Sequence, residues 1–170
     1  NNVTAANLAM TAAGGIGSDA AGGTEDAIET NVTNFAANAG TGDVLITEAD
    51  TMNITQVTDN LKGNTVNGVT GGIDVCIDVL AGDLNVNEDV MAGNDVALRA
   101  NGNVVLGEDG GAGGTDGVVT AGNTVAVSAV TGNITDGNTN NNVRAGNLVM
   151  TAAGGIGSDA AGMNDNEIET

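Results

Sequence analysis

The stretch AGNDVALRANGNVVL, Ala92–Leu106, contains the pattern that decides the fold. Twice within it a Gly-Asn pair precedes apolar residues at alternate positions, first Val96 and Leu98 and then Val104 and Leu106. An apolar residue at every second position is typical of a β-strand with one buried face. Because glycine and asparagine tolerate the backbone conformations of tight bends, the stretch predicts two short strands joined by a turn.

The same pattern recurs along the chain. An Asn or Asp that follows a small or polar residue, and precedes alternating apolar residues, stands at positions 7, 43, 64, 83, 103, 123 and 147. Most neighbouring positions lie about 20 residues apart, and the one gap of 36 fits two steps of about 18. The spacing therefore predicts coils of about 20 residues, with about seven coils in 140 residues.

A longer repeat contains the shorter one. The sequence NLAMTAAGGIGSDAAG at Asn7–Gly22 returns as NLVMTAAGGIGSDAAG at Asn147–Gly162, and the two copies differ only at Ala9 and Val149. Such internal repeats indicate a tandem architecture. We therefore expect residues 1–140 to form one full tandem unit and residues 141–170 to begin the next.

The apolar residues are of an unusual kind. The chain has no Trp, Tyr or Pro, a single phenylalanine (Phe35) and 28 glycines, although 41% of its residues are hydrophobic. A core without large aromatic side chains has to be thin and regular, built from rows of small aliphatic residues. These features predict an all-β fold, a parallel β-solenoid whose coils stack about 4.7–4.9 Å apart. Repeated β-sandwich modules are disfavoured by the lack of aromatic residues, and disorder by the regular alternation.

The bends are rich in asparagine. In stacked coils, equivalent asparagines lie above one another, and their side-chain amides can form hydrogen-bonded ladders. The sequence predicts such ladders at bends that include Asn7, Asn103, Asn123 and Asn147.

The chain resembles the repeat regions of very large bacterial surface and secreted proteins of the filamentous-haemagglutinin and autotransporter kind. The resemblance rests on GNLVMTAAGGIGS, on AIETNVTNFAANAGTGDVLITEADTMNI and on the AGNDVALRANGNVVL pattern, and it covers essentially the whole chain. It implies a right-handed parallel β-helix that is exported and serves as an adhesin, stalk or extracellular scaffold. The near-identity of the two copies is tighter than the resemblance leads one to expect; it favours a recent duplication or a uniform fibre and argues less for a specific receptor-binding site.

The chain is strongly acidic. Its 22 Asp and Glu against 3 Lys and Arg give a formal net charge of −19, which argues against nucleic acid and anionic membranes as partners. Divalent cations such as Ca²⁺ would relieve the repulsion through oxygen ligands. The acidic bends that recur with the long unit supply the candidate ligands, which are Asp19, Glu25, Asp26, Asp159 and Asp165. Solvated loops without metal are the alternative.

A second calcium motif is less complete. The run GGAGGTDGV at Gly110–Val118 approaches the consensus of calcium-binding RTX repeats. Asp116 falls one position late when the motif is counted from Gly110, and Ala112 replaces a glycine when it is counted from Gly111. A secreted RTX-like calcium-binding module therefore stays open as an alternative function.

The sequence contains few candidate catalytic residues. Cys76 is the only cysteine, and the chain has no histidine to activate it. In DVCIDVL, Cys76 alternates with Val75 and Ile77 and is expected on the more polar face of a strand. A β-helical polysaccharide-processing enzyme is the other alternative, with Arg99 and Arg144 as its only arginines.

The sequence thus predicts a non-catalytic structural repeat. It would form a stiff acidic rod at the cell surface or outside the cell. Its partners would be neighbouring repeats or copies of itself, joined head to tail and also side by side, together with a cell-surface or matrix ligand.

Overall fold

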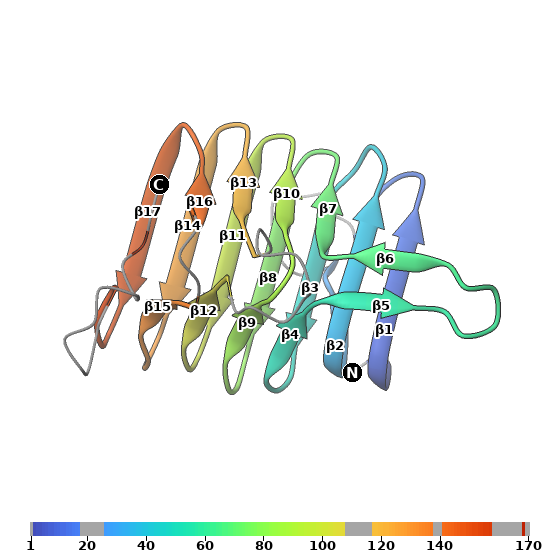
Figure 1. Cartoon of the computed structure of the whole chain (residues 1–170), viewed down its shortest axis with the longest axis horizontal. Coiled ribbons are helices and arrows are strands. Elements are labelled where there is room, and N and C mark those ends of the chain that lie inside the picture. The colour runs from blue at the N-terminus through green and yellow to red at the C-terminus, as the bar shows by residue number, and fades with distance from the viewer. Residues whose placement is uncertain (1, 18–25, 108–116, 138–140, 158–167, 169–170) are drawn as a thin grey trace.

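The computed structural model describes residues 2–17, 26–107, 117–137, 141–157 and 168. Most of its strands stack along the long axis of the molecule in three rows, which we call walls A, B and C (Figure 1). Wall A contains β3 (Val44–Glu48), β8 (Val75–Val79), β11 (Asp95–Ala100), β14 (Thr124–Ala129) and β17 (Asn147–Ala152). Wall B contains β4 (Met52–Ile54), β9 (Leu84–Val86), β12 (Val104–Leu106) and β15 (Ile134–Asp136). Wall C contains β7 (Val69–Gly71), β10 (Val90–Ala92), β13 (Val119–Ala121) and β16 (Val143–Arg144).

The remaining strands lie near the N-terminus. The long strand β2 (Ile28–Ala39) pairs with β4 and β7, so it runs along walls B and C, and β1 (Val3–Ala12) pairs with β2. The first residues of β2 also pair with β3 on wall A. Between walls B and C, β5 (Gln56–Thr58) and β6 (Thr65–Asn67) form a hairpin that crosses β2 and β1 and extends past β1 (Figure 1).

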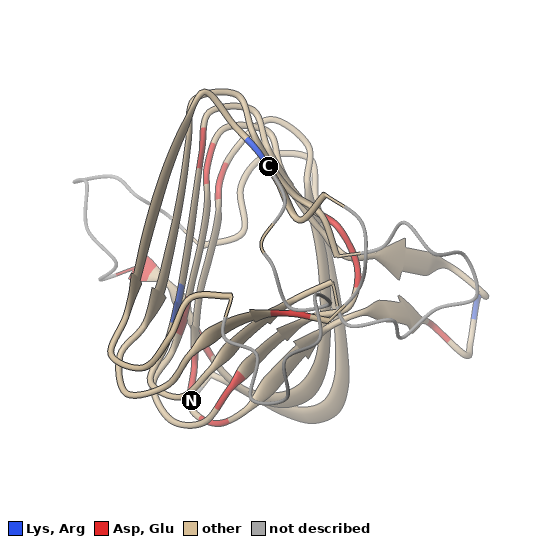
Figure 2. Ribbon diagram, turned by 60° about the vertical axis from the view of Figure 1, so that its left-hand side comes forward, with Lys and Arg blue, Asp and Glu red and all other residues tan. Residues whose placement is uncertain are grey.

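Parallel pairing unites fifteen of the described strands into one sheet. Every pairing between the described strands is parallel except that of β5 with β6. The chain passes along walls A, B and C and then returns to wall A one layer further on, and Figure 2 shows the walls meeting at corners. The prediction of an all-β fold with a large parallel, solenoid-like sheet is therefore confirmed.

The core consists of columns of like aliphatic residues. On wall A, Val44, Val75, Val96 and Val125 form one such column, and each is at most 1% exposed. A second column on wall B contains Met52, Leu84, Val104 and Ile134. Each buried aliphatic side chain contributes about 1.5–3 kcal/mol of burial free energy. The single phenylalanine, Phe35, is fully buried and pairs with Ile54 in a third column.

The strands that were expected from alternating residues are present. Val44, Ile46, Leu84, Val86, Val104 and Leu106 all lie on β-strands and are at most 1% exposed. The exception is the step at Asn64, because GNTVN belongs to the antiparallel hairpin and not to a wall.

The length of a turn is not uniform. Val75 pairs with Val96 at a step of 21 residues, but Val44 pairs with Val75 at a step of 31. In the turn from Val44 to Val75 the added residues lie between walls B and C, where the β5–β6 hairpin leaves the sheet. In addition, Asp83 and Asn103 lie between walls A and B, whereas Asp43 and Asn123 lie between walls C and A. Their spacing therefore does not measure a turn, and the registers do not confirm the seven expected coils.

Hydrogen-bonded ladders stabilise the wall B side of the stack. Asn34 Nδ2 donates to Asn7 Oδ1 at 2.8 Å, Asn53 Nδ2 to Asn34 Oδ1 at 3.2 Å, and Asn85 Nδ2 to Asn53 Oδ1 at 2.9 Å. These bonds join four layers through side chains alone.

A second kind of ladder reaches the backbone at the corners. Asn103 Oδ1 accepts a hydrogen bond from the Asn133 backbone N–H at 2.9 Å, and Asp83 Oδ1 accepts one from the Asn103 N–H. Between walls C and A, Asn147 Nδ2 donates to Asn123 Oδ1 at 3.4 Å. Amide ladders are therefore present at Asn7, Asn103, Asn123 and Asn147 as predicted, although Asn7 lies within β1 and not at a bend.

Candidate functional site

The predicted calcium ligands fall mostly outside the described residues. Asp26 is described and is exposed to solvent just before β2. The other four, Asp19, Glu25, Asp159 and Asp165, lie outside the described ranges, as does most of the RTX-like run. Among the described residues, no group of three or more His, Cys, Asp or Glu side chains is placed to hold a metal ion. The calcium site thus stays a prediction.

Cys76 lies on the outer face of wall A. Its neighbours Val75 and Ile77 on β8 are 1% and 0% exposed, whereas Cys76 is half-buried. The prediction that Cys76 occupies the more polar face of its strand is therefore confirmed.

An apolar hollow of about 290 Å³ runs along this outer face. We call it the outer groove. Its floor is formed by side chains that pair in register across β8, β11, β14 and β17, namely Cys76, Ala97, Ala126 and Val149. The rim of the groove is the neighbouring column of outward-facing residues, two positions further along each strand: Asp78, Arg99, Ser128 and Thr151. The floor lies lower than the rim because the side chains of Cys76, Ala97 and Ala126 are shorter than those of Asp78 and Arg99.

The two arginines lie on different walls. Arg99 is on the rim of the outer groove, where its Nη1 donates to Asp78 Oδ1 at 2.5 Å. Arg144 lies on β16 in wall C and is exposed. The structure therefore does not bring them together in one groove.

A buried carboxylate lies at the corner between walls A and B. Glu48 is fully buried, and its Oε2 accepts a hydrogen bond from Thr30 Oγ1 at 2.6 Å. The backbone N–H groups of Val32 and Asp50 also donate to this carboxylate. Glu48 thus ties β2 to β3 and is a structural group.

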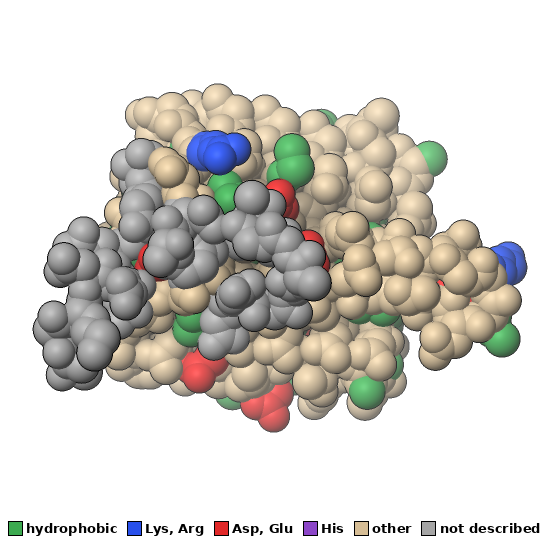
Figure 3. All heavy atoms as spheres, viewed as in Figure 1, with side chains coloured by type: hydrophobic (Ala, Val, Ile, Leu, Met, Phe, Trp, Pro, Cys, Tyr) green, Lys and Arg blue, Asp and Glu red, His purple; other side chains and the backbone are tan. Residues whose placement is uncertain are grey.

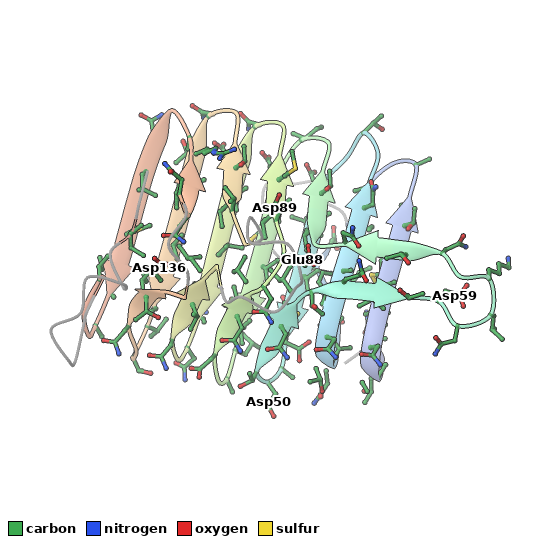
Figure 4. The ribbon with its side chains drawn as sticks, viewed as in Figure 1. Asp50, Asp59, Glu88, Asp89 and Asp136 are labelled. Carbon is green, nitrogen blue, oxygen red and sulfur yellow. The ribbon has the colours of Figure 1, made fainter. Side chains whose placement is uncertain are left out.

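The hairpin covers part of the outer surface. Ala36 points outward from β2 and is nevertheless 0% exposed, while Val57 of the hairpin is 7% exposed. Beside this contact, Thr11 and Asn38 line a second hollow with Asn64, Thr65, Val66 and Asn67. Beyond β1 the hairpin continues into solvent, with Asp59 close to its end (Figures 3 and 4).

The two ends of the stack carry the duplicated strand. Among the described strands, β1 pairs with β2 alone and β17 pairs with β14 alone. The duplicated isoleucine differs between the copies, because Ile16 is 5% exposed and pairs with Val44, whereas Ile156 is 47% exposed. The next layer, which contains Val44, therefore buries Ile16, and no described layer covers Ile156 in the same way.

The outer groove, Glu48 and the hairpin were not identified from the sequence. Small outward residues such as Ala97 and Ala126 form a groove only once the strand pairing places them side by side. For the hairpin a signal existed, since TDNLKGNT at 58–65 is polar and carries a turn glycine, Gly63, with φ of 69°.

The described residues contain no helix that is long and apolar enough to cross a bilayer. No family model, curated protein or solved structure matches the chain.

Proposed function

We propose that the chain is a structural repeat of an extracellular fibre, stalk or adhesin. The observation that carries this proposal is the position of the duplicated strand, which lies at both ends of one continuous parallel sheet as β1 and β17. Among the described strands, each of these two pairs along one edge only, and such free edges accept further strands. A repeat whose two ends share a sequence is suited to stacking on further copies of itself.

The side chains support a mechanical role. Like residues stack on like residues in the core columns, and the Asn7–Asn34–Asn53–Asn85 ladder adds hydrogen bonds along the same axis. Because every layer contacts only its neighbours, length grows with the number of repeats without a change in the core.

The proposal includes a right-handed winding of the chain around the long axis of the stack. Connections between parallel strands of one sheet are right-handed in about 98% of cases, since a twisted strand returns to its sheet most easily in that sense. The resemblance to bacterial surface repeats points to the same hand and to export. The acidic surface, with a net charge of −19, would keep separate rods apart in solution.

The length of the particle tests the proposal. Five pairing steps join Ile16 to Leu148, and a partial turn leads on to Ile156, the duplicate of Ile16. With layers about 4.8 Å apart, each unit should add about 25 Å. Chains with one, two and three units can be imaged by negative-stain electron microscopy. We expect rods of constant width whose length increases by this amount per unit. Globular particles, or a length independent of unit number, would contradict the proposal.

A further inference from the structure

The structure shows both neighbours of the duplicated strand. As β17, this strand pairs with β14 before it, and as β1 it pairs with β2 after it. Where a further copy of the unit precedes this one, its β14 therefore belongs on the open edge of β1. The asparagine at this position can serve both layers, because Asn147 donates through Nδ2 to Asn123 and Asn7 accepts through Oδ1 from Asn34.

The outward columns continue across this junction. Ala9 pairs with Ala36, and its duplicate Val149 pairs with Ala126 on the floor of the outer groove. Thr11 pairs with Asn38 in the same way, and its duplicate Thr151 pairs with Ser128 on the rim. The surface under the hairpin is thus continuous with the outer groove of the preceding unit.

The hairpin points along this continuous surface. It crosses β2 and β1 in the direction of the stack and projects beyond β1 (Figures 1 and 3). Val57 is buried on β5, which contacts β2, and Leu61 follows four residues later. Asn60, Leu61 and Lys62 form the turn of the hairpin, so the roughly 13 Å that four extended residues span, between two and three strand spacings of about 4.8 Å, is the upper limit of this reach. Leu61 would therefore lie beyond β1, over the Ala126 and Ala97 positions of the preceding unit.

The chemistry of the two surfaces is complementary. Leu61 is 95% exposed at the end of the hairpin, and the floor of the groove is apolar and lined by small side chains. The charged residues on the rim, Asp78 and Arg99, form an ion pair, so the match between the two surfaces is apolar.

We propose that the β5–β6 hairpin docks in the outer groove of the preceding unit and fastens the two units together. Leu61 fills the hollow over Ala97 and Ala126. The occupant of the groove is thus a second copy of this unit, on the same chain or on another. This inference rests on the proposed function, because it requires units stacked end to end.

Disulfide trapping tests the contact in a chain of two units, residues 1–140 followed by 1–170. Cys76→Ser in both units removes the native thiol. Leu61→Cys is placed in the second unit, and Ala97→Cys or Ala126→Cys in the first. Two cysteines form a disulfide only when their Cα atoms lie about 4.4–6.8 Å apart. We expect one of the two pairs to cross-link under mild oxidation, as seen by gel mobility and by mass of the intact chain.

The matched control carries the same two substitutions within the second unit. We expect no cross-link there, because the hairpin points away from the outer groove of its own unit. Rods that form while neither cross-unit pair reacts would overturn the docking and leave the structural function intact. Equal reaction of the control pair would also overturn it, and particles that are not rods would overturn both proposals.

A second measurement does not depend on thiol chemistry. Leu61→Asp should leave the melting temperature of the 170-residue chain unchanged, since Leu61 is 95% exposed there. In the two-unit chain the same substitution in the second unit should lower the melting temperature by several degrees. Leu80→Asp, at a corner residue that is 53% exposed, is the control and should have an equally small effect in both chains. Identical melting shifts for Leu61→Asp in the one-unit and two-unit chains would count against docking.

Discussion

At the scale of single residues, buried polar groups fix how one layer lies on the next. Glu48 is fully buried and accepts hydrogen bonds from Thr30, Val32 and Asp50. Asn53 uses both ends of its amide, because it donates to Asn34 and accepts from Asn85. A hydrophobic column tolerates sliding along its own direction more readily than such directional contacts do.

Replacing the buried carboxylate should be costly. In Glu48→Gln one acceptor oxygen becomes an NH₂ group that faces N–H or O–H donors, and the free energy of unfolding should fall by about 1–3 kcal/mol. Urea unfolding followed by circular dichroism measures the change. Glu29→Gln on β2, where the side chain is half-buried, is the control and should change stability much less. Equal losses in the two variants would contradict the role assigned to Glu48.

The interior of the asparagine ladder should matter more than its end. Asn53→Ala removes bonds to Asn34, Asn85 and the Thr33 carbonyl, whereas Asn7→Ala removes the single bond to Asn34. At about 0.5–1.5 kcal/mol per hydrogen bond, the first variant should lose roughly three times as much stability as the second. Comparing their melting temperatures tests this, and an equal effect would show that the ladder contributes little.

At the scale of strands and turns, the sequence allowed the wall strands to be predicted because alternation reports directly on which face is buried. Val104 and Leu106 behave as expected for this reason. Alternation does not report strand direction. The pattern in GNTVN at 63–67 therefore predicts a parallel strand of the solenoid, although this segment forms one strand of an antiparallel hairpin. Sequence spacing also misses the varying number of residues per turn, which is 31 from Val44 to Val75 and 21 from Val75 to Val96. The outer groove depends on pairing between distant strands, and no single strand encodes it.

Glycines at the corner between walls C and A allow the layers to approach. A Cβ on Gly93 would lie within 3.0 Å of the Gly72 carbonyl oxygen, and Gly72 faces Gly40 in the same way. We expect Gly93→Ala to lower the melting temperature by several degrees, because backbone atoms of two layers would have to move apart. Gly14→Ala is the control, since nothing lies within 4 Å of its Cβ position. A neutral Gly93→Ala would mean that the corner can relax.

At the scale of the whole molecule, stacking concentrates negative charge. Asp43 and Asp74 lie in adjacent layers at one corner, where Asp43 Oδ1 accepts the Asp74 backbone N–H and Asp74 Oδ1 accepts that of Asp95. Figure 2 shows acidic segments side by side at a corner of the stack. Fixed at about 4.8 Å spacing, these carboxylates repel one another while their hydrogen bonds hold them in place.

Salt should therefore stabilise the fold. Asp74→Asn keeps the acceptor oxygen and removes one of the stacked charges, so it should raise the free energy of unfolding by about 1 kcal/mol at low ionic strength. The gain should shrink in 1 M NaCl, where the Debye length is about 3 Å. Asp59→Asn in the hairpin changes the net charge equally and is the control. The melting temperatures of both variants, measured at low ionic strength and in 1 M NaCl, test this. Equal stabilisation by Asp74→Asn and Asp59→Asn would assign the effect to net charge alone.

The registers have a consequence for any long array. Five pairing steps lead from Ile16 to Leu148 on wall A, and eight further residues lead to Ile156, the duplicate of Ile16, on wall B. A unit is therefore not a whole number of turns. Ile156 lies one wall beyond Ile16 and Asn147 two walls beyond Asn7, so each copy is rotated about the fibre axis by roughly a third to two-thirds of a revolution relative to the one before. The hairpins would then spiral around the fibre, so that it has no single front or back, and electron micrographs of long arrays should show projections on all sides.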